Sequence, residues 1–123
     1  MKPDISNRAD IEKLIYLFYE KVKQDEVIGF FFSDIVAVNW EKHLPTMCDF
    51  WENVLFYSGK YDGNPLATHR RINQLHPTNS AHFEHWINLF DEAVDSLFEG
   101  ANADKIKQRS KAIAAVMQQK IDL

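Results

Sequence analysis

Hydrophobic side chains recur every three or four positions through much of the chain, which is the spacing of one face of an α-helix. The first such stretch covers residues 8–24, with its apolar stripe at Ile11, Leu14, Ile15, Phe18 and Val22. Ser6 or Asn7 can cap the start of this helix, because both side chains accept a backbone hydrogen bond. Residues 26–36 predict a short helix or turn, packed through Phe30, Phe31 and Phe32.

A second helix is predicted after Asn39, a residue type suited to a helix N-cap. Its apolar stripe consists of Trp40, His43, Leu44, Met47, Trp51, Val54 and Leu55. Pro45 lies within this stretch. Because a proline inside a helix removes one backbone hydrogen bond and costs about 3 kcal/mol, we expect a bend or a short non-helical start before Pro45.

Turn-forming residues then break the helical pattern twice. Residues 58–65 read SGKYDGNP, in which Asp-Gly and Asn-Pro both favour turns. Pro65 is expected to open a short helix whose periodicity ends near Ile72. The second break is HPTNS at residues 76–80. These residues therefore predict a loop, a short helix and a second loop in the middle of the chain.

The strongest helical pattern follows the second break. Thr78 or Ser80 is expected to cap this long helix and Gly100 to end it. Its stripe consists of Phe83, Trp86, Ile87, Phe90, Val94, Leu97 and Phe98. A last helix is predicted from about Ala103 to Ile121. No segment alternates apolar and polar residues long enough to predict a strand, so the fold class is all-α.

Composition places the chain among ordinary globular proteins. Its 123 residues suit one domain spanning 1–123, and 46% of them are hydrophobic. A net charge of −4 argues against a nucleic-acid partner, which needs a basic footprint. No apolar run approaches the roughly 20 residues of a membrane span. The single cysteine, Cys48, and a start without the apolar stretch of a secretory signal favour a cytoplasmic protein.

Three polar side chains interrupt the apolar stripes and are candidates for function. Tyr19 follows Ile15 by four positions, His43 lies one turn after Trp40, and Trp86 lies in the middle of its stripe. A buried polar group without a hydrogen bond costs free energy. Each of the three can satisfy itself on a nearby backbone carbonyl. Together they suggest one shared cavity with several hydrogen-bond donors.

His69 stands on the predicted short helix, with Leu66 and Ile72 as its large apolar neighbours. One imidazole presented in this way suits a single axial ligand to a flat apolar cofactor. A zinc site needs three or four nitrogen or sulfur ligands at close spacing. His82 and His85 have no such companions, so we interpret them as solvated helix residues.

Other reactive residues give weaker signals. Cys48 has no helix start or fixed base beside it and is interpreted as an inert small hydrophobe. A basic run is spread around its helix and predicts a solvated surface; it consists of Lys105, Lys107, Arg109 and Lys111. Hydrolase and kinase chemistry have no supporting residues, because a Gly-rich phosphate loop and a G-x-S-x-G turn are both missing.

Several motifs nevertheless follow one another in a fixed order and register. They are Phe18-Tyr19-Glu20-Lys21-Val22, Trp40 with His43, Phe50-Trp51, Tyr61-Asp62-Gly63-Asn64-Pro65 followed by His69, His82-Phe83 with Trp86, and Leu89-Phe90. From about Ile11 to Met117 the chain resembles the truncated haemoglobins of group III, within the globin superfamily. The lack of a Gly-Gly pair agrees with that group. Pro45, just after His43, departs from the family pattern.

The resemblance implies a two-over-two helical sandwich around haem b. By matching position, His69 corresponds to the proximal iron ligand. Tyr19 and Trp86 correspond to the distal tyrosine and tryptophan, and His43 to the distal histidine.

Three further residues are expected to contact the cofactor. The resemblance implies that Met47 lies over the haem face and that Phe32 wedges against the porphyrin edge. Arg70 is the residue we expect to meet a haem propionate, because a guanidinium suits carboxylate geometry.

A family member of this kind is expected to bind O₂, NO and CO at a five-coordinate ferrous iron. Each hydrogen bond from a distal donor to bound O₂ contributes roughly 1.5–3 kcal/mol, which slows release. This favours O₂, NO or peroxide redox chemistry with a reductase partner, as in NO dioxygenation, over bulk transport. Two alternatives remain: storage or sensing without turnover, and a helical interaction module without a cofactor.

Overall fold

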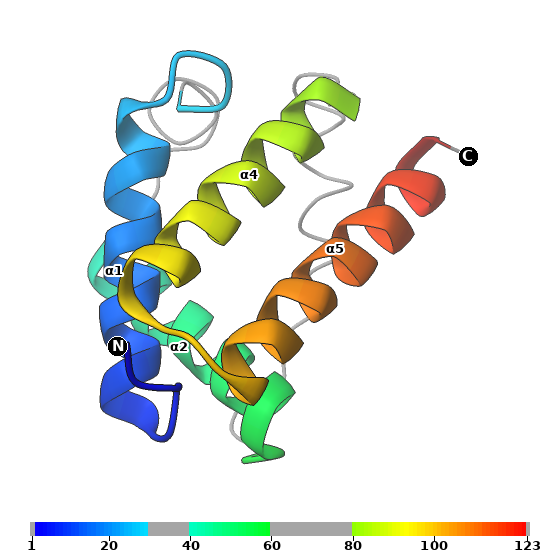
Figure 1. Cartoon of the computed structure of the whole chain (residues 1–123). Helices are drawn as coiled ribbons and strands as arrows, with labels where there is room; N and C mark the ends of the chain where they lie inside the picture. The colour runs from blue at the N-terminus through cyan, green and yellow to red at the C-terminus, as the bar shows by residue number, and fades with distance from the viewer. Residues whose placement is uncertain (1, 30–39, 60–79, 123) are drawn as a thin grey trace.

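Four helices make up the regular structure of the residues that the structure describes. The computed structural model describes residues 2–29, 40–59 and 80–122. Its helices are α1 (Arg8–Gln24), α2 (Trp40–Phe56), α4 (Ser80–Leu97) and α5 (Ala101–Asp122), and no strand occurs in these ranges (Figure 1). The predicted all-α class is confirmed. The expected helix at 8–24 is confirmed at both ends, and the last helix extends the predicted one by two residues at its start and one at its end.

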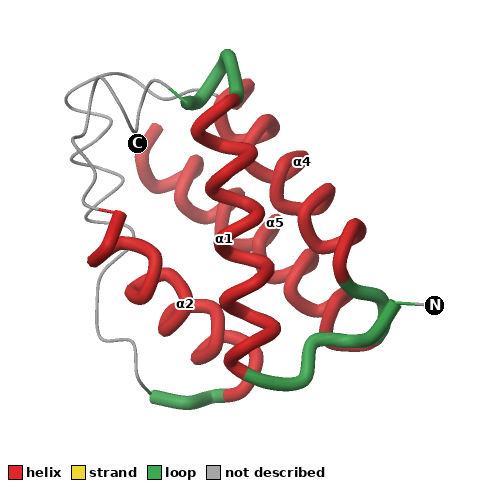
Figure 2. The backbone as a smooth tube through the Cα atoms, turned by 90° about the vertical axis from the view of Figure 1, so that its left-hand side faces the viewer, coloured by secondary structure: helices red, strands yellow, loops and turns green. Residues whose placement is uncertain are grey.

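The helices form two roughly antiparallel pairs, α1 with α2 and α4 with α5, and the two pairs cross each other. α1 packs against α2 and α4, and α5 packs against α4 and α2. Figure 2 shows α1 in front, with α2 on one side of it, α4 on the other and α5 passing behind it. This is the expected two-over-two arrangement, and it directs the inner faces of α1, α2 and α4 toward a common interior.

Local hydrogen bonds fix both ends of α1. The side chain of Asn7 accepts a hydrogen bond from the backbone N–H of Asp10 at 3.0 Å. Of the two caps that the sequence allowed, Ser6 and Asn7, the N-cap is therefore Asn7. Past the helix, the Asp25 carboxylate accepts from the N–H groups of Val27 and Ile28, each at 3.0 Å. These bonds form a turn over residues 26–29, as predicted, whereas Phe30 to Phe32 lie outside the described residues.

The short non-helical start expected before Pro45 is not present, because α2 is continuous through Pro45; the alternative, a bend, stays a prediction. Proline removes the donor that would bond the Glu41 carbonyl. Both Glu41 and Pro45 are exposed, so water can hydrogen-bond that carbonyl and reduce the cost. The hydroxyl of Thr46 also donates to the Lys42 carbonyl at 2.9 Å in this turn. The proposed cap at Asn39 lies outside the described residues.

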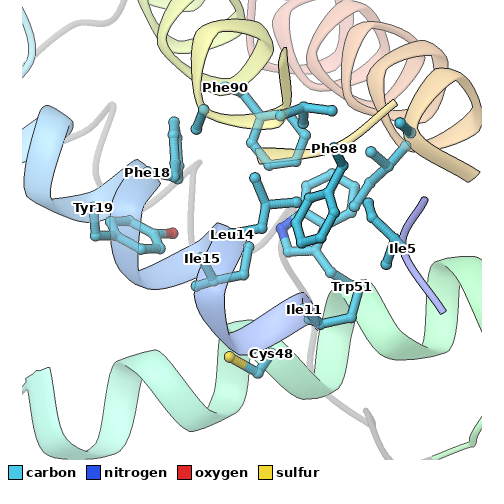
Figure 3. Packing of buried hydrophobic residues seen from close by; sticks show 14 of the residues in the cluster. Ile5, Ile11, Leu14, Ile15, Phe18, Tyr19, Cys48, Trp51, Phe90 and Phe98 are labelled. Atoms are coloured by element: carbon cyan, nitrogen blue, oxygen red, sulfur yellow. The ribbon is translucent and has the colours of Figure 1, made fainter. Parts of the chain in front are cut away.

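The core lies between the four helices and is largely aliphatic and aromatic (Figure 3). All five stripe residues of α1 are fully buried. Cys48 is buried among them, and this burial raises the pKa of its thiol to about 11. The thiol therefore stays protonated in neutral solution, which agrees with its interpretation as an inert hydrophobe.

One ion-pair network joins α1 to α2. The guanidinium of Arg8 lies 2.6 Å from the Asp49 carboxylate and 3.6 Å from that of Glu52, whose side chain is nearly buried. The Arg8 guanidinium also donates to the Pro45 carbonyl at 3.5 Å. Because Arg8 opens α1 and its partners lie in the middle and second half of α2, the network helps to fix how these helices cross.

The N-terminal segment caps α5, a contact between residues almost 100 positions apart. The Asp4 carboxylate accepts from the N–H groups of Asn102 at 3.0 Å and Ala103 at 2.9 Å. Gly100 has a φ of 140°, and a Cβ on it would lie 2.6 Å from Cγ of Asp4. Gly100 was expected to end the preceding helix. α4 instead stops at Leu97, and Gly100 provides the close approach before α5.

Replacing Asp4 by Ala is expected to destabilise the fold by about 1–2 kcal/mol, the usual effect of losing a cap. Burial opposes ionisation of Asp4, but the N–H bonds from Asn102, Ala103 and Ile5 outweigh it and hold its pKa below 3.8. The contribution is therefore present above pH 3.8 and is lost as the pH falls through the lower folded-state pKa. Urea unfolding of both proteins at pH 7 and pH 3 measures this. A stability difference that is equal at both pH values would contradict the role of the charge.

Candidate functional site

Tyr19 carries a polar hydroxyl on a side chain that is buried in the apolar interior. Its position on α1, one turn after Ile15, puts it on the buried face, and only 6% of it is exposed. Figure 3 shows its ring beside Phe18 at the edge of the core. Burial raises the pKa of the Tyr19 phenol well above its ordinary value of 10. The hydroxyl therefore keeps its proton in neutral solution and can donate a hydrogen bond.

Tyr19 meets the start of α2 in a group of three aromatic rings. Its ring centroid lies 5.0 Å from that of His43 and 5.5 Å from that of Trp40. Trp40 and His43 are 5.6 Å apart, and all three pairs are edge to face. Because Trp40 and His43 are three positions apart on one helix, both can face α1. We call Tyr19, Trp40 and His43 the ring triad. The Nε2 atom of His43 is buried within this region.

Trp86 lies beside the ring triad, with Phe18 between them. The Phe18 ring contacts Tyr19 at 4.9 Å and Trp86 at 5.6 Å. On its other side Trp86 stacks on Phe90 at 5.6 Å and on Trp51 at 6.5 Å. The structure thus brings all three polar candidates into one aromatic cluster at the meeting of α1, α2 and α4. The shared cavity suggested by the sequence stays a prediction.

Apolar side chains flank the buried core, and we call them the apolar lining. Partly buried side chains on the inner faces of α2, α4 and α5 pack against the core while keeping some exposed surface. They are Leu44, Met47, Phe50, Val54, Leu89 and Ile113. An apolar lining that carries a phenol, an imidazole and an indole fits a flat haem with a small polar molecule beside it. Met47 is one of these side chains and lies one turn after His43; its contact with the haem face stays a prediction.

The remaining predicted contacts lie outside the described residues. These are His69, the predicted iron ligand, Phe32 and Arg70. Within the ranges that the structure describes, no group of three or more His, Cys, Asp or Glu side chains could hold a metal ion. No helix found there is long and apolar enough to cross a bilayer.

Two residues next to Tyr19 and His43 were not predicted as part of the site. Trp40 was assigned to an apolar stripe and to the family motif without a role in the site, and the sequence pattern assigned no role to Lys23. The Nζ atom of Lys23 lies 4.3 Å from the Trp40 ring centroid, within cation–π range. Lys23 follows Tyr19 by four positions and Trp40 precedes His43 by three. This helical spacing is the signal that could have identified them.

The histidines and lysines on α4 and α5 have structural partners. Nδ1 of His85 lies 3.6 Å from the Asp25 carboxylate, and its side chain is 43% exposed. His82 is partly buried. In the basic run, Lys107 pairs with Asp95 at 2.7 Å, so the run links α5 to α4 instead of being wholly solvated.

Comparison with known proteins shows a likeness over almost the whole chain. No protein-family model matches it. The chain is 32% identical over 121 residues to the group 3 truncated hemoglobin ctb of Campylobacter jejuni. The matched region covers 96% of this chain and 93% of that protein. The crystal structure of the group III truncated hemoglobin from Campylobacter jejuni matches with a TM-score of 0.85 at 32% identity. That match covers 98% of this chain and 95% of the other.

Proposed function

The chain belongs to the group III truncated haemoglobins, and we propose that it binds O₂ tightly and uses it in redox chemistry. Membership of the family makes it a globin that binds haem and diatomic gases. The proposal goes further, because it assigns individual residues to the haem and its ligand and names a reaction. The observation that carries it is the buried Tyr19 phenol in ring contact with His43, where burial raises the phenol's pKa.

We assign the cofactor as haem b and His69 as its iron ligand, from the position that His69 shares with the family motif. Haem iron supplies a coordination position for O₂, NO or CO. Met47 and Phe32 provide apolar contacts, and Arg70 pairs with a propionate. The apolar lining on α2 and α4 supports this assignment, because its partly buried side chains offer a flat apolar cofactor a surface to pack against.

Tyr19, Trp86 and His43 are assigned as the residues that hold the ligand. O₂ in a ferrous globin gains negative charge, which hydrogen-bond donors stabilise. Tyr19 donates from Oη and Trp86 from Nε1. Each such bond contributes roughly 1.5–3 kcal/mol, and about 1.4 kcal/mol changes a rate or an equilibrium tenfold. Two donors therefore slow O₂ release by at least two orders of magnitude, which suits reaction better than delivery.

The reaction that we assign is oxidation of nitric oxide to nitrate. One NO, one O₂ and one electron give one nitrate ion, so the protein needs an electron donor for each turnover. We assign this role to a partner reductase. The same protonated Tyr19 can supply a hydrogen bond to a peroxide, which makes peroxide activation the related reaction.

Mixing the reduced, oxygen-saturated protein with NO tests the function. We expect one nitrate per haem in a single mixing, and continuous nitrate formation when a chemical reductant and excess O₂ are supplied. Nitrate analysis with and without the reductant measures both. If NO persists and the protein releases its O₂ unchanged, the result instead supports storage or sensing without turnover.

A further inference from the structure

We propose that Trp40, held by Lys23, is a positioning residue that sets the orientation of Tyr19 and His43 toward the ligand. The inference rests on the proposed function, because it takes Tyr19 as a ligand donor. It concerns two residues, Trp40 and Lys23, to which the proposed function gives no role.

The ring triad couples the orientation of its three members. Trp40 makes edge-to-face contacts with Tyr19 at 61° between ring planes and with His43 at 87°. Tyr19 and His43 also contact each other directly, at 78°. Since an edge-to-face contact depends on the angle between the rings, turning Trp40 would alter both neighbouring contacts. Trp40 is therefore placed to restrict the phenol and the imidazole together.

The Tyr19 ring contacts a fully buried ring on the core side and a partly buried ring at the start of α2. Phe18, fully buried in the core, contacts its ring at 4.9 Å. Trp40 contacts the same ring at 5.5 Å but is only partly buried and stands at the start of α2. The core thus restricts Tyr19 from within, and Trp40 and His43 add restriction from the α2 side.

Lys23 supplies a further contact that holds Trp40. Its Nζ atom lies 4.3 Å from the Trp40 ring centroid, and it also pairs with the Glu20 carboxylate at 3.2 Å. Because Lys23 follows Tyr19 by one helical turn, α1 contacts Trp40 at two successive turns. A ring held at two points has less freedom to turn than a ring packed at one. Lys23 therefore acts on Tyr19 and His43 through Trp40.

The C–O stretch of the CO-bound haem protein, measured by infrared spectroscopy, tests the inference, because its frequency depends on hydrogen bonds to CO. We expect Trp40→Leu to shift the band in the same direction as Tyr19→Phe and to split it. It should also speed O₂ release about fivefold, because the Trp40 ring contacts with both Tyr19 and His43 are lost. Trp40→Phe, which keeps an aromatic ring, should show mostly the single band of the unmodified protein. Lys23→Met should give a smaller shift in the same direction.

Lys21→Met is the matched control. It removes one positive charge two positions away on the same helix, from a lysine whose partner is Glu92 on α4 at 3.9 Å. We expect it to leave the C–O band unchanged. Thermal unfolding of every variant separates packing from positioning.

The outcomes separate this inference from the function on which it rests. If Tyr19→Phe shifts the band but Trp40→Leu and Lys23→Met leave it unchanged, with only the melting temperature lowered, Trp40 is structural and the inference is wrong. An equal shift in Lys21→Met and Lys23→Met would also overturn it, since charge alone would explain the effect. If Tyr19→Phe itself leaves the band unchanged, Tyr19 is not a hydrogen-bond donor to the ligand, and the proposed function and the inference that rests on it are both wrong.

Discussion

His69→Ala protein is expected to lose its Soret band or to show it displaced. In our assignment the His69 imidazole is the protein's bond to iron, and the contacts from Met47 and Phe32 are apolar. Removing the imidazole therefore removes the bond to iron and leaves the apolar contacts and the assigned Arg70–propionate pair. Titrating both purified haem-free proteins with hemin, and following the Soret absorbance, measures the loss.

His85→Ala is the control for this experiment. It removes an imidazole from α4, where the His85 side chain is 43% exposed and lies against Asp25. We expect it to take up hemin like the unmodified protein. Free imidazole added to His69→Ala should restore part of the normal spectrum, because it can occupy the vacated position. A normal Soret band in His69→Ala would show that another residue binds the iron.

Tyr19→Phe is expected to release O₂ about 10- to 100-fold faster than the unmodified protein, the effect of losing one hydrogen bond to a charged acceptor. The substitution removes only the hydroxyl and retains the ring that packs against Phe18 and His43. Because the raised pKa of Tyr19 keeps this hydroxyl protonated, the difference should persist from pH 6 to pH 9. Stopped-flow displacement of O₂ by CO measures the release rate.

Tyr16→Phe provides the matched control, because Tyr16 lies on the same helix but is 49% exposed. We expect its release rate to equal that of the unmodified protein. If the unmodified protein and Tyr19→Phe both release O₂ rapidly and alike, hydrogen bonding by Tyr19 does not set the rate. Tight retention would then have to be abandoned as the basis of the proposed reaction.

The helices were predictable where burial alone determines them. The α1 stripe from Ile11 to Val22 is fully buried, because a helix that covers a core must present one continuous apolar face. Pro45 misled the prediction, since helix propensity describes an average environment. It does not show that the Glu41 carbonyl lies at an exposed helix start where water can bond to it.

The site was only partly predictable for a different reason. Periodicity showed that Tyr19 and His43 face inward, but which rings meet depends on how α1 crosses α2. Contacts distant in sequence, such as Arg8 with Asp49, help to set that crossing and leave no periodic signal. The cap that Asp4 provides for α5 was missed for the same reason. The assignments of His69, Phe32 and Arg70 came from the family resemblance and remain predictions.

The visible spectrum of the ferrous protein, recorded before and after addition of CO, tests the central claim most directly. With hemin supplied and then reduced, we expect a broad five-coordinate Soret band that sharpens and moves when CO is added. A protein that stays colourless after titration with hemin would contradict haem binding itself. A ferrous spectrum unchanged by CO would contradict an open ligand position beside Tyr19 and His43.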